Sequence, residues 1–170
     1  MPPIPSTEQA APQLSAEEIG RRFLRLIESL ESSEDLSLQR VKDVIELPIH
    51  KATHGDFFGV EGDLNNGWTY IFNFYPKTGS NKNYIVLRFV HGDERFPVMT
   101  PVCSLAFVDY HNALKDMGYV DYPKYGEIGD LVEWMYRKGD VVIAIVPEVK
   151  YSESEKGLAP TCVRSISTLN

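Results

Sequence analysis

The sequence has no run of 18 apolar residues and little positive charge, and each shortage excludes a class of protein. Without a long apolar run, no segment is expected to span a membrane as a helix. The 170 residues contain 17 Lys and Arg against 24 Asp and Glu, which gives a net charge of −7. Nucleic-acid binding needs clustered cations, so a charged partner is expected to be a basic protein and not a nucleic acid.

The N-terminal region lacks a basic segment followed by an apolar one, so the chain as written is expected to carry no signal peptide. Residues 1–14 are rich in Pro, Ala and Gln, a composition that cannot bury enough apolar surface to order itself. We therefore expect a disordered tail at 1–14 and a folded domain at 15–170. The tail is compatible with a plain terminus or with a spacer left where a signal segment was replaced by a starting Met.

Cysteine is scarce, with Cys103 before a predicted helix and Cys162 at the start of the last predicted strand. Two buried thiols in a cytoplasmic protein and one disulfide in an exported protein are both compatible with this count. A disulfide requires the two Cα atoms to lie within about 7 Å of each other. If it forms, we expect a periplasmic protein whose signal has been removed; if not, a cytoplasmic one.

Recognisable catalytic motifs are missing as well. No Gly-x-Ser-x-Gly elbow, phosphate-binding glycine loop or Cys-x-x-Cys pair is present. Scattered His and Asp residues occur by chance in many domains, so we expect no metal site, no cofactor and no enzyme. The residues that could supply metal ligands or acid–base chemistry are His50, His54 and Asp56; His91 and Asp93; and Asp109 and His111.

Three helices are predicted. A capping box at 15–18 precedes apolar residues at helical spacing through 19–30, which predicts an amphipathic helix of about four turns. Ser37 can cap a second helix, which Pro48 ends. A third helix is expected at about 104–117.

Alternating apolar residues and intervening turns predict two antiparallel meanders. The expected strands are at about 57–60, 68–74, 84–90, 131–138, 141–146 and 163–169.

Two segments share six identities in register, which predicts an internal duplication. We expect an α+β fold of two tandem helix-plus-meander repeats, at about 34–91 and 100–169, forming one continuous sheet with helices on one face. The paired residues are Gly59 and Gly126, Gly62 and Gly129, Asp63 and Asp130, Leu64 and Leu131, Trp68 and Trp134, and Tyr70 and Tyr136.

The pattern of residues 34–169 resembles a known family. The spacing Ser37-x-x-x-Val41-x-x-Val44-x-x-Leu47-Pro48, followed by a Gly-x-x-Gly-Asp segment and a Trp-x-Tyr strand, resembles the tandem-repeat beta-lactamase inhibitor protein fold and the related outer-membrane assembly lipoproteins. The resemblance implies a protein that grips a partner protein with a concave, aromatic-lined sheet and its loops. A small acidic domain of this kind also suits an immunity protein that blocks a secreted toxin.

We therefore expect a non-enzymatic, protein-binding inhibitor, most simply an immunity protein that neutralises a basic bacterial toxin or hydrolase. An envelope scaffold of the assembly-lipoprotein kind is the first alternative, and a metal-dependent hydrolase the second. Because Trp and Tyr are enriched at interface hot spots, they are expected to anchor the partner on the open face, with acidic residues on its rim. These residues are Trp68, Tyr70, Trp134 and Tyr136 as anchors, with Asp63, Asp130 and Glu133 on the rim.

Overall fold

The computed structural model describes residues 13–92, 101–149 and 160–169. The tail predicted at 1–14 lies almost wholly outside these ranges. The described helices are α1 (Ala16–Glu28), the short 3-10 helix η1 (Ser33–Asp35), α2 (Leu38–Ile45) and α3 (Phe107–Asp116). The strands are β1 (His50–Lys51), β2 (Phe58–Asn65), β3 (Trp68–Tyr75), β4 (Tyr84–His91), β5 (Val120–Tyr125), β6 (Leu131–Lys138), β7 (Val141–Val149) and β8 (Pro160–Thr168).

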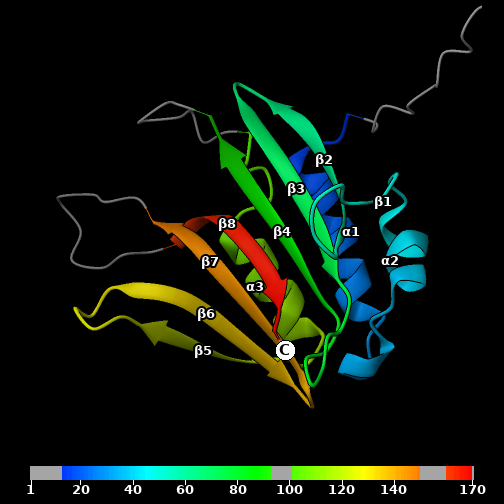
Figure 1. Ribbon diagram of the computed structural model, residues 1–170. Helices are drawn as coiled ribbons and strands as arrows, with labels where there is room; N and C mark the ends of the chain where they lie inside the picture. The colour runs from blue at the N-terminus through cyan, green and yellow to red at the C-terminus, as the bar shows by residue number, and fades with distance from the viewer. Residues whose placement is uncertain (1–12, 93–100, 150–159, 170) are drawn as a thin grey trace, which may run out of the picture.

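All eight strands form one antiparallel sheet in the order β1-β2-β3-β4-β8-β7-β6-β5 (Figure 1). Strands β1 to β4 make one half and β5 to β8 the other. The halves join where β4 pairs with β8, through the residue pairs Val86–Ser167, Leu87–Ile166 and Arg88–Ser165. The predicted α+β class with one continuous antiparallel sheet is therefore confirmed.

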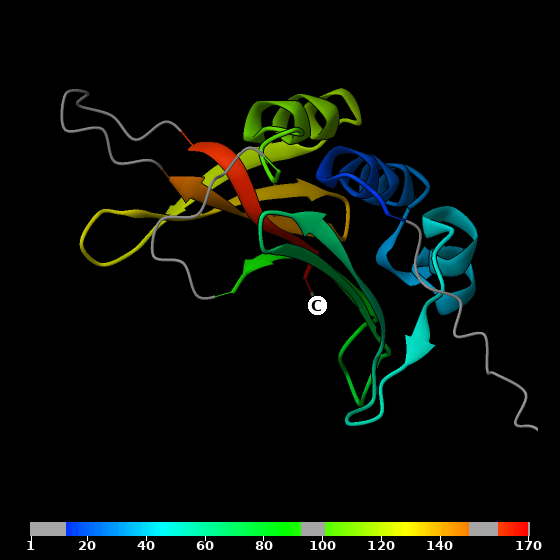
Figure 2. The ribbon, with the colours of Figure 1, turned by 90° about the horizontal axis from the view of Figure 1, so that it is seen from above.

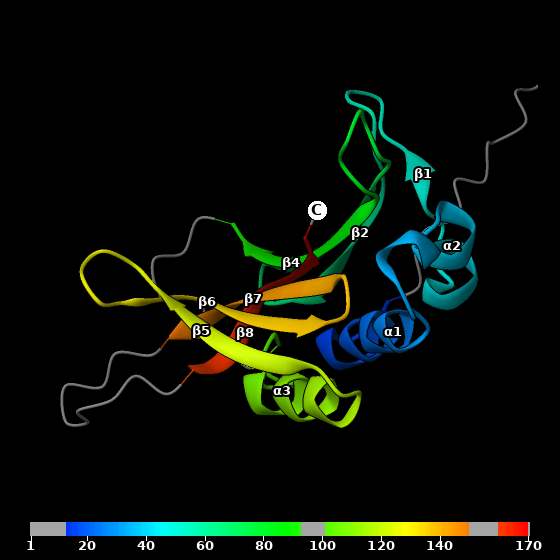
Figure 3. The ribbon, with the colours of Figure 1, turned by 90° about the horizontal axis from the view of Figure 1, so that it is seen from below.

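The helices cover only one side of the sheet. Figures 2 and 3 show the two halves meeting at an angle, with α1, α2 and α3 on the outer side and no described helix on the inner side. On the covered side Phe23 of α1 packs edge-on against Phe72 of β3, with ring centroids 6.2 Å apart. No helix in the described ranges is long and apolar enough to cross a membrane.

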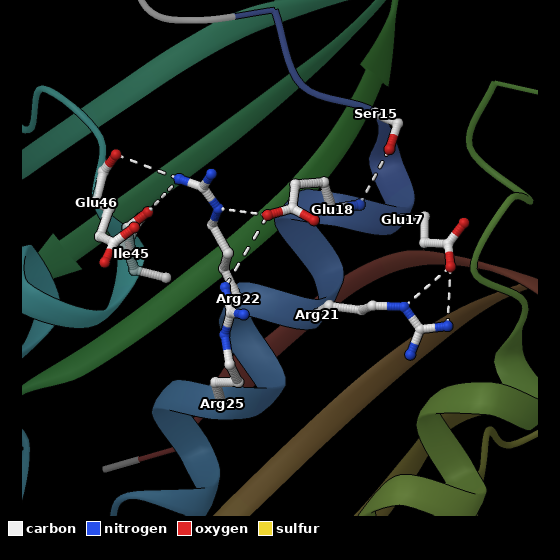
Figure 4. A network of polar contacts seen from close by, with 8 residues as sticks. All are labelled: Ser15, Glu17, Glu18, Arg21, Arg22, Arg25, Ile45 and Glu46. Atoms are coloured by element: carbon white, nitrogen blue, oxygen red, sulfur yellow. Dashed lines mark hydrogen bonds and ion pairs between the residues drawn. The ribbon is translucent and has the colours of Figure 1, made fainter.

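Helix α1 begins where the capping box predicts it, because Ser15 Oγ accepts a hydrogen bond from the Glu18 amide at 3.1 Å. Figure 4 shows how α1 then holds α2. Arg22 donates to Glu18 at 2.9 Å and to the Ile45 carbonyl at 2.8 Å, at the C-terminal end of α2. The guanidinium group of Arg22 thus binds carbonyl groups at the end of α2 that have no hydrogen-bond partner within that helix.

The alignment of the two predicted repeats is not confirmed. Residues 59–63 lie within β2, whereas residues 126–130 form the turn between β5 and β6. Strand β3, which carries Trp68, is one strand away from the β4–β8 junction, and β6, which carries Trp134, is two strands away. In position β3 therefore corresponds to β7. Six identities among Gly, Asp, Leu and aromatic residues, all common in meanders, were not enough to fix the alignment.

Two strands were not predicted. Strand β1 has only two residues, and β5 is an edge strand with Pro123 in it and no buried side chain, so neither shows a buried alternation. The turn between β2 and β3 is formed at Asn65, Asn66 and Gly67, which all have positive φ. Helix α3 starts at Phe107, later than the predicted 104, and ends before Gly118, whose φ is +89°.

Cys103 and Cys162, the pair considered for a disulfide, are bonded, with their Cα atoms 5.0 Å apart. The bond ties β8 to the segment before α3. It closes a loop between residues 59 positions apart in sequence, for which chain entropy implies a stabilisation of about 4 kcal/mol.

Asp140 joins three segments that are distant in sequence. In the turn between β6 and β7, it accepts hydrogen bonds from the amide and hydroxyl of Ser33 in η1 and, at 2.9 Å, from the ammonium group of Lys82 before β4. These donors, Ser33 first and then Lys82, hold the pKa of Asp140 well below its ordinary value of 3.8. The carboxylate therefore links the N-terminal helices to both halves of the sheet.

We predict that Asp140→Asn lowers the melting temperature near neutral pH and that its effect shrinks in acid. Because the folded pKa is depressed, the contribution of Asp140 is full above the unfolded pKa of about 4 and is lost as pH falls below it. Thermal unfolding of both proteins between about pH 6 and pH 2.5 measures the difference. A difference in melting temperature that stays constant over this range would contradict the prediction.

Candidate protein-binding face

The four predicted aromatic anchors do not lie on the open side of the sheet. Tyr70 and Tyr136 are 0% exposed and Trp68 is 7% exposed, and all three belong to the core. Trp134 is half-buried and packs against that core. The prediction that these residues contact a partner from the open face was therefore wrong. Side chains two positions apart in a strand point to the same side of the sheet. Trp68 and Tyr70 therefore point to the side covered by the helices, as Phe72 does.

Trp134 and Tyr136 pack against α3. The Trp134 ring lies 5.4 Å from Phe107 and 5.9 Å from His111, and His111 Nδ1 lies 2.9 Å from the Tyr136 hydroxyl. Trp134 also donates its indole N–H to Asp121 of β5 at 3.0 Å. Hydrogen bonds from Lys115 and then Trp134 lower the pKa of Asp121, while burial raises the pKa of Tyr136. The indole N–H of Trp134 and the hydroxyl of Tyr136 thus both have polar partners within the fold.

Trp68 lies in the other half of the sheet, at the start of β3. It meets His91 of β4 edge-on, with ring centroids 5.1 Å apart, and His91 Nε2 lies 2.7 Å from the Asn66 carbonyl. Trp68 and His91 therefore fix the turn between β2 and β3 against the end of β4.

The predicted acidic rim is divided between the two ends of the sheet. Asp63 is exposed near the end of β2, in one half. Asp130 ends the turn before β6, and Glu133 on β6 forms an ion pair with Lys124 at 3.5 Å. Asp63 pairs with Thr69, and Glu133 is two positions before Met135, so both carboxylates point to the side of the sheet opposite the helices, one in each half.

The candidates for metal or acid–base chemistry have separate roles. Asp109 caps α3 by accepting from the Ala106 amide at 2.8 Å, whereas His111 contacts Tyr136. His50 lies on β1, with His54 and Asp56 exposed on the loop that follows. Asp93 lies outside the described residues. Within the described ranges, no three His, Cys, Asp or Glu residues are grouped so that they could hold a metal ion.

The side of the sheet opposite the helices is the candidate site, and we call it the concave face. Strand pairing defines it, because partners in adjacent strands point to the same side. Its members are Thr69, Ile71, Asn73 and Tyr75 on β3; Tyr84, Val86, Arg88 and Val90 on β4; Ser165 and Ser167 on β8; Val142, Ala144 and Val146 on β7; and Met135 and Arg137 on β6.

Short, uncharged side chains line the centre of the concave face. Around the β4–β8 junction these are Val86, Ser165 and Ser167, with Ala144 and Val146 on β7. All but Ala144, which is 4% exposed, are half-buried. Arg88, which pairs with Ser165, adds an exposed, charged side chain at the same junction.

Charges on the concave face are of both signs. Arg88 lies near the centre and Arg137 on β6, whereas Glu61 and Asp63 lie on β2 and Glu133 on β6. The net negative charge of the chain is therefore not concentrated on this face, and the face does not by itself require a basic partner.

Aromatic rings form one margin of the face. Tyr75 and Tyr84 stack with centroids 4.5 Å apart, and Phe57 lies 5.3 Å from Tyr75. All three are half-buried. They adjoin a pocket of about 370 Å³ formed where β1 and the loop after it meet β2 and β3.

Asn73 is central to this pocket. It is a polar residue of the concave face, yet it is only 6% exposed. Its side-chain amide donates to the Tyr75 hydroxyl at 3.2 Å. Gly59 of β2 makes room for it, because a Cβ at that position would collide with Asn73 Oδ1.

Comparison of the chain with protein-family models, with curated proteins and with solved structures finds no match.

We predict that Tyr70 is a structural residue whose hydroxyl is dispensable. Its hydroxyl is buried and has no hydrogen-bond partner among the described residues, and burial raises the pKa of the phenol. Tyr70→Phe should leave the free energy of unfolding unchanged or higher, because it removes an unpaired buried polar group. Tyr70→Ala should lower it by about 3 to 5 kcal/mol.

Urea unfolding measures both changes. A loss of more than about 1 kcal/mol in Tyr70→Phe would show that the hydroxyl has a hydrogen-bond partner after all.

Proposed function

We propose that the protein is a non-enzymatic protein-binding inhibitor, an immunity protein that neutralises a secreted bacterial toxin or hydrolase by holding it on the concave face. The observation that carries the proposal is the one-sided cover of the sheet. Eight strands present a face with no described helix on it, and half-buried valines and serines lie at its centre.

The shape and composition of the concave face suit a protein partner. Interfaces have an uncharged core and a polar rim, and they are enriched in aromatic residues. Val86, Val146 and Ser165 supply such a core at the bend of the sheet, and Tyr75 and Tyr84 lie at its margin. The partner would contact this side of the sheet, which no described helix covers (Figure 3).

The hairpin of β5 and β6 adds a second apolar surface at the far edge. Tyr125, Ile128 and Val132 lie at or near its tip, and Ile128 is 92% exposed. Exposed apolar side chains grouped in this way mark interaction sites on soluble proteins. We propose that this tip contacts the same partner beside the concave face.

The disulfide between Cys103 and Cys162 supports an oxidising compartment for this function. We propose that the protein acts in the periplasm, where a secreted toxin or hydrolase would also be encountered.

The experiment is to purify the products of the genes adjacent to this one and to measure their binding and their inhibition. We predict that one of them binds at micromolar concentration or below. Ser165→Trp should weaken that binding at least about thirtyfold, or roughly 2 kcal/mol, because a large ring fills the centre of the concave face.

The matched control is Asn112→Trp, which places the same ring on the exposed side of α3. It should leave the affinity unchanged, and both variants should keep the wild-type melting temperature within a few degrees. The immunity proposal fails if no adjacent product binds. The assignment of the concave face fails if Asn112→Trp weakens binding as much as Ser165→Trp does.

A further inference from the structure

The pocket beside the concave face has polar and aromatic lining residues to which the proposed function assigns no role. Its volume is about 370 Å³, which suits a single large side chain or a small molecule. The lining residues that matter here are His50, His54, Phe57, Glu61, Ile71 and Asn73.

The floor of the pocket offers an unused acceptor. Asn73 is more than nine-tenths buried, and its amide nitrogen already donates to Tyr75. Its Oδ1 atom accepts no hydrogen bond from any residue in the described ranges. This oxygen is not among the fully buried side-chain atoms without a partner, so a donor that enters the pocket can reach it.

The wall of the pocket offers a second acceptor. Glu61 lies opposite Ile71 in the pairing of β2 with β3, and both line the pocket. No Lys, Arg or His of the described chain lies within ion-pair distance of its carboxylate. Lys51 also borders the pocket but does not pair with Glu61, so the negative charge remains available.

The rest of the lining is mixed: Phe57, Val60 and Ile71 are apolar, and His50, Lys51, Thr53 and His54 are polar. Phe57 and Ile71 can cover an aliphatic stem, and the face of an aromatic ring attracts a cation. An apolar stem can pack on Phe57 and Ile71, while a group with several donors in different directions can reach both Glu61 and Asn73.

We infer that this pocket binds the guanidinium group of an arginine presented by the partner. A guanidinium group is planar, carries five N–H donors and can reach Glu61 and Asn73 Oδ1 at the same time, which the compact ammonium group of lysine does less well. The inference rests on the proposed function, because it identifies one side chain by which the partner would be held.

The test needs no partner protein. The blocked amino acid N-acetyl-L-arginine N-methylamide is titrated into the isotopically labelled protein, and the amide signals of Gly59 and Ile71 and the side-chain amide signal of Asn73 are followed by NMR. The neutral isostere N-acetyl-L-citrulline N-methylamide is titrated in parallel. We expect saturable shifts at these three residues with the arginine compound and at least about fivefold weaker binding of the citrulline compound.

Glu61→Gln should weaken binding of the arginine compound at least about fivefold. The control is Glu28→Gln, which removes the same charge from an exposed position on α1 and should leave the affinity unchanged. Matching amide spectra outside the pocket show that each variant is folded. Equal binding of citrulline, no saturable shift, or an unchanged affinity in Glu61→Gln would each overturn the inference.

Failure of this titration leaves the concave-face proposal intact, because Ser165 lies at the centre of the sheet and not in the pocket. Conversely, if no adjacent gene product binds but the arginine compound does, the pocket is real and its guanidinium comes from a source other than that partner.

Discussion

The pairing of β4 with β8 is the interaction on which the rest of the structure depends. It is short, with three paired residues on each strand, yet it makes one sheet out of two four-stranded halves. Because the halves meet at an angle there, the helices pack on the outer side and the inner side is left as the concave face (Figure 2). On that side of the junction Val86, Ser165 and Ser167 are short, and Arg88 adds a long, charged side chain.

Several contacts stabilise this arrangement, some within one half of the sheet and one between the halves. The Cys103–Cys162 disulfide ties β8 to the segment before α3. Asp140 ties the turn between β6 and β7 to η1 and to the segment before β4. On the covered side, Trp68 and Trp134 pack within their own halves, against His91 and Phe107 respectively. Trp68 and Trp134, which were predicted to contact a partner, therefore stabilise the side of the sheet opposite the concave face.

Much of the fold could be predicted from the sequence, because local signals determine it. Ser15 and Ser37 cap α1 and α2 as expected, and alternation located most of β3, β4, β6 and β7. The face that binds could not be predicted as easily. Alternation places Trp68, Tyr70, Phe72 and Phe74 together, but only packing shows that all four are buried in the core. The strand order, the bend at β4–β8 and the pocket at Asn73 depend on contacts between distant segments, so no local pattern indicates them.

The central claim is that the concave face, and not the helical side, holds the partner. Hydroxyl-radical footprinting measures it directly, by comparing side-chain oxidation in the free protein and in its complex with the adjacent gene product that binds it. We predict that complex formation protects Tyr75 and Tyr84 and leaves Val108, which is exposed on α3, unchanged. Protection of Val108 together with unchanged oxidation of Tyr75 and Tyr84 would contradict the claim.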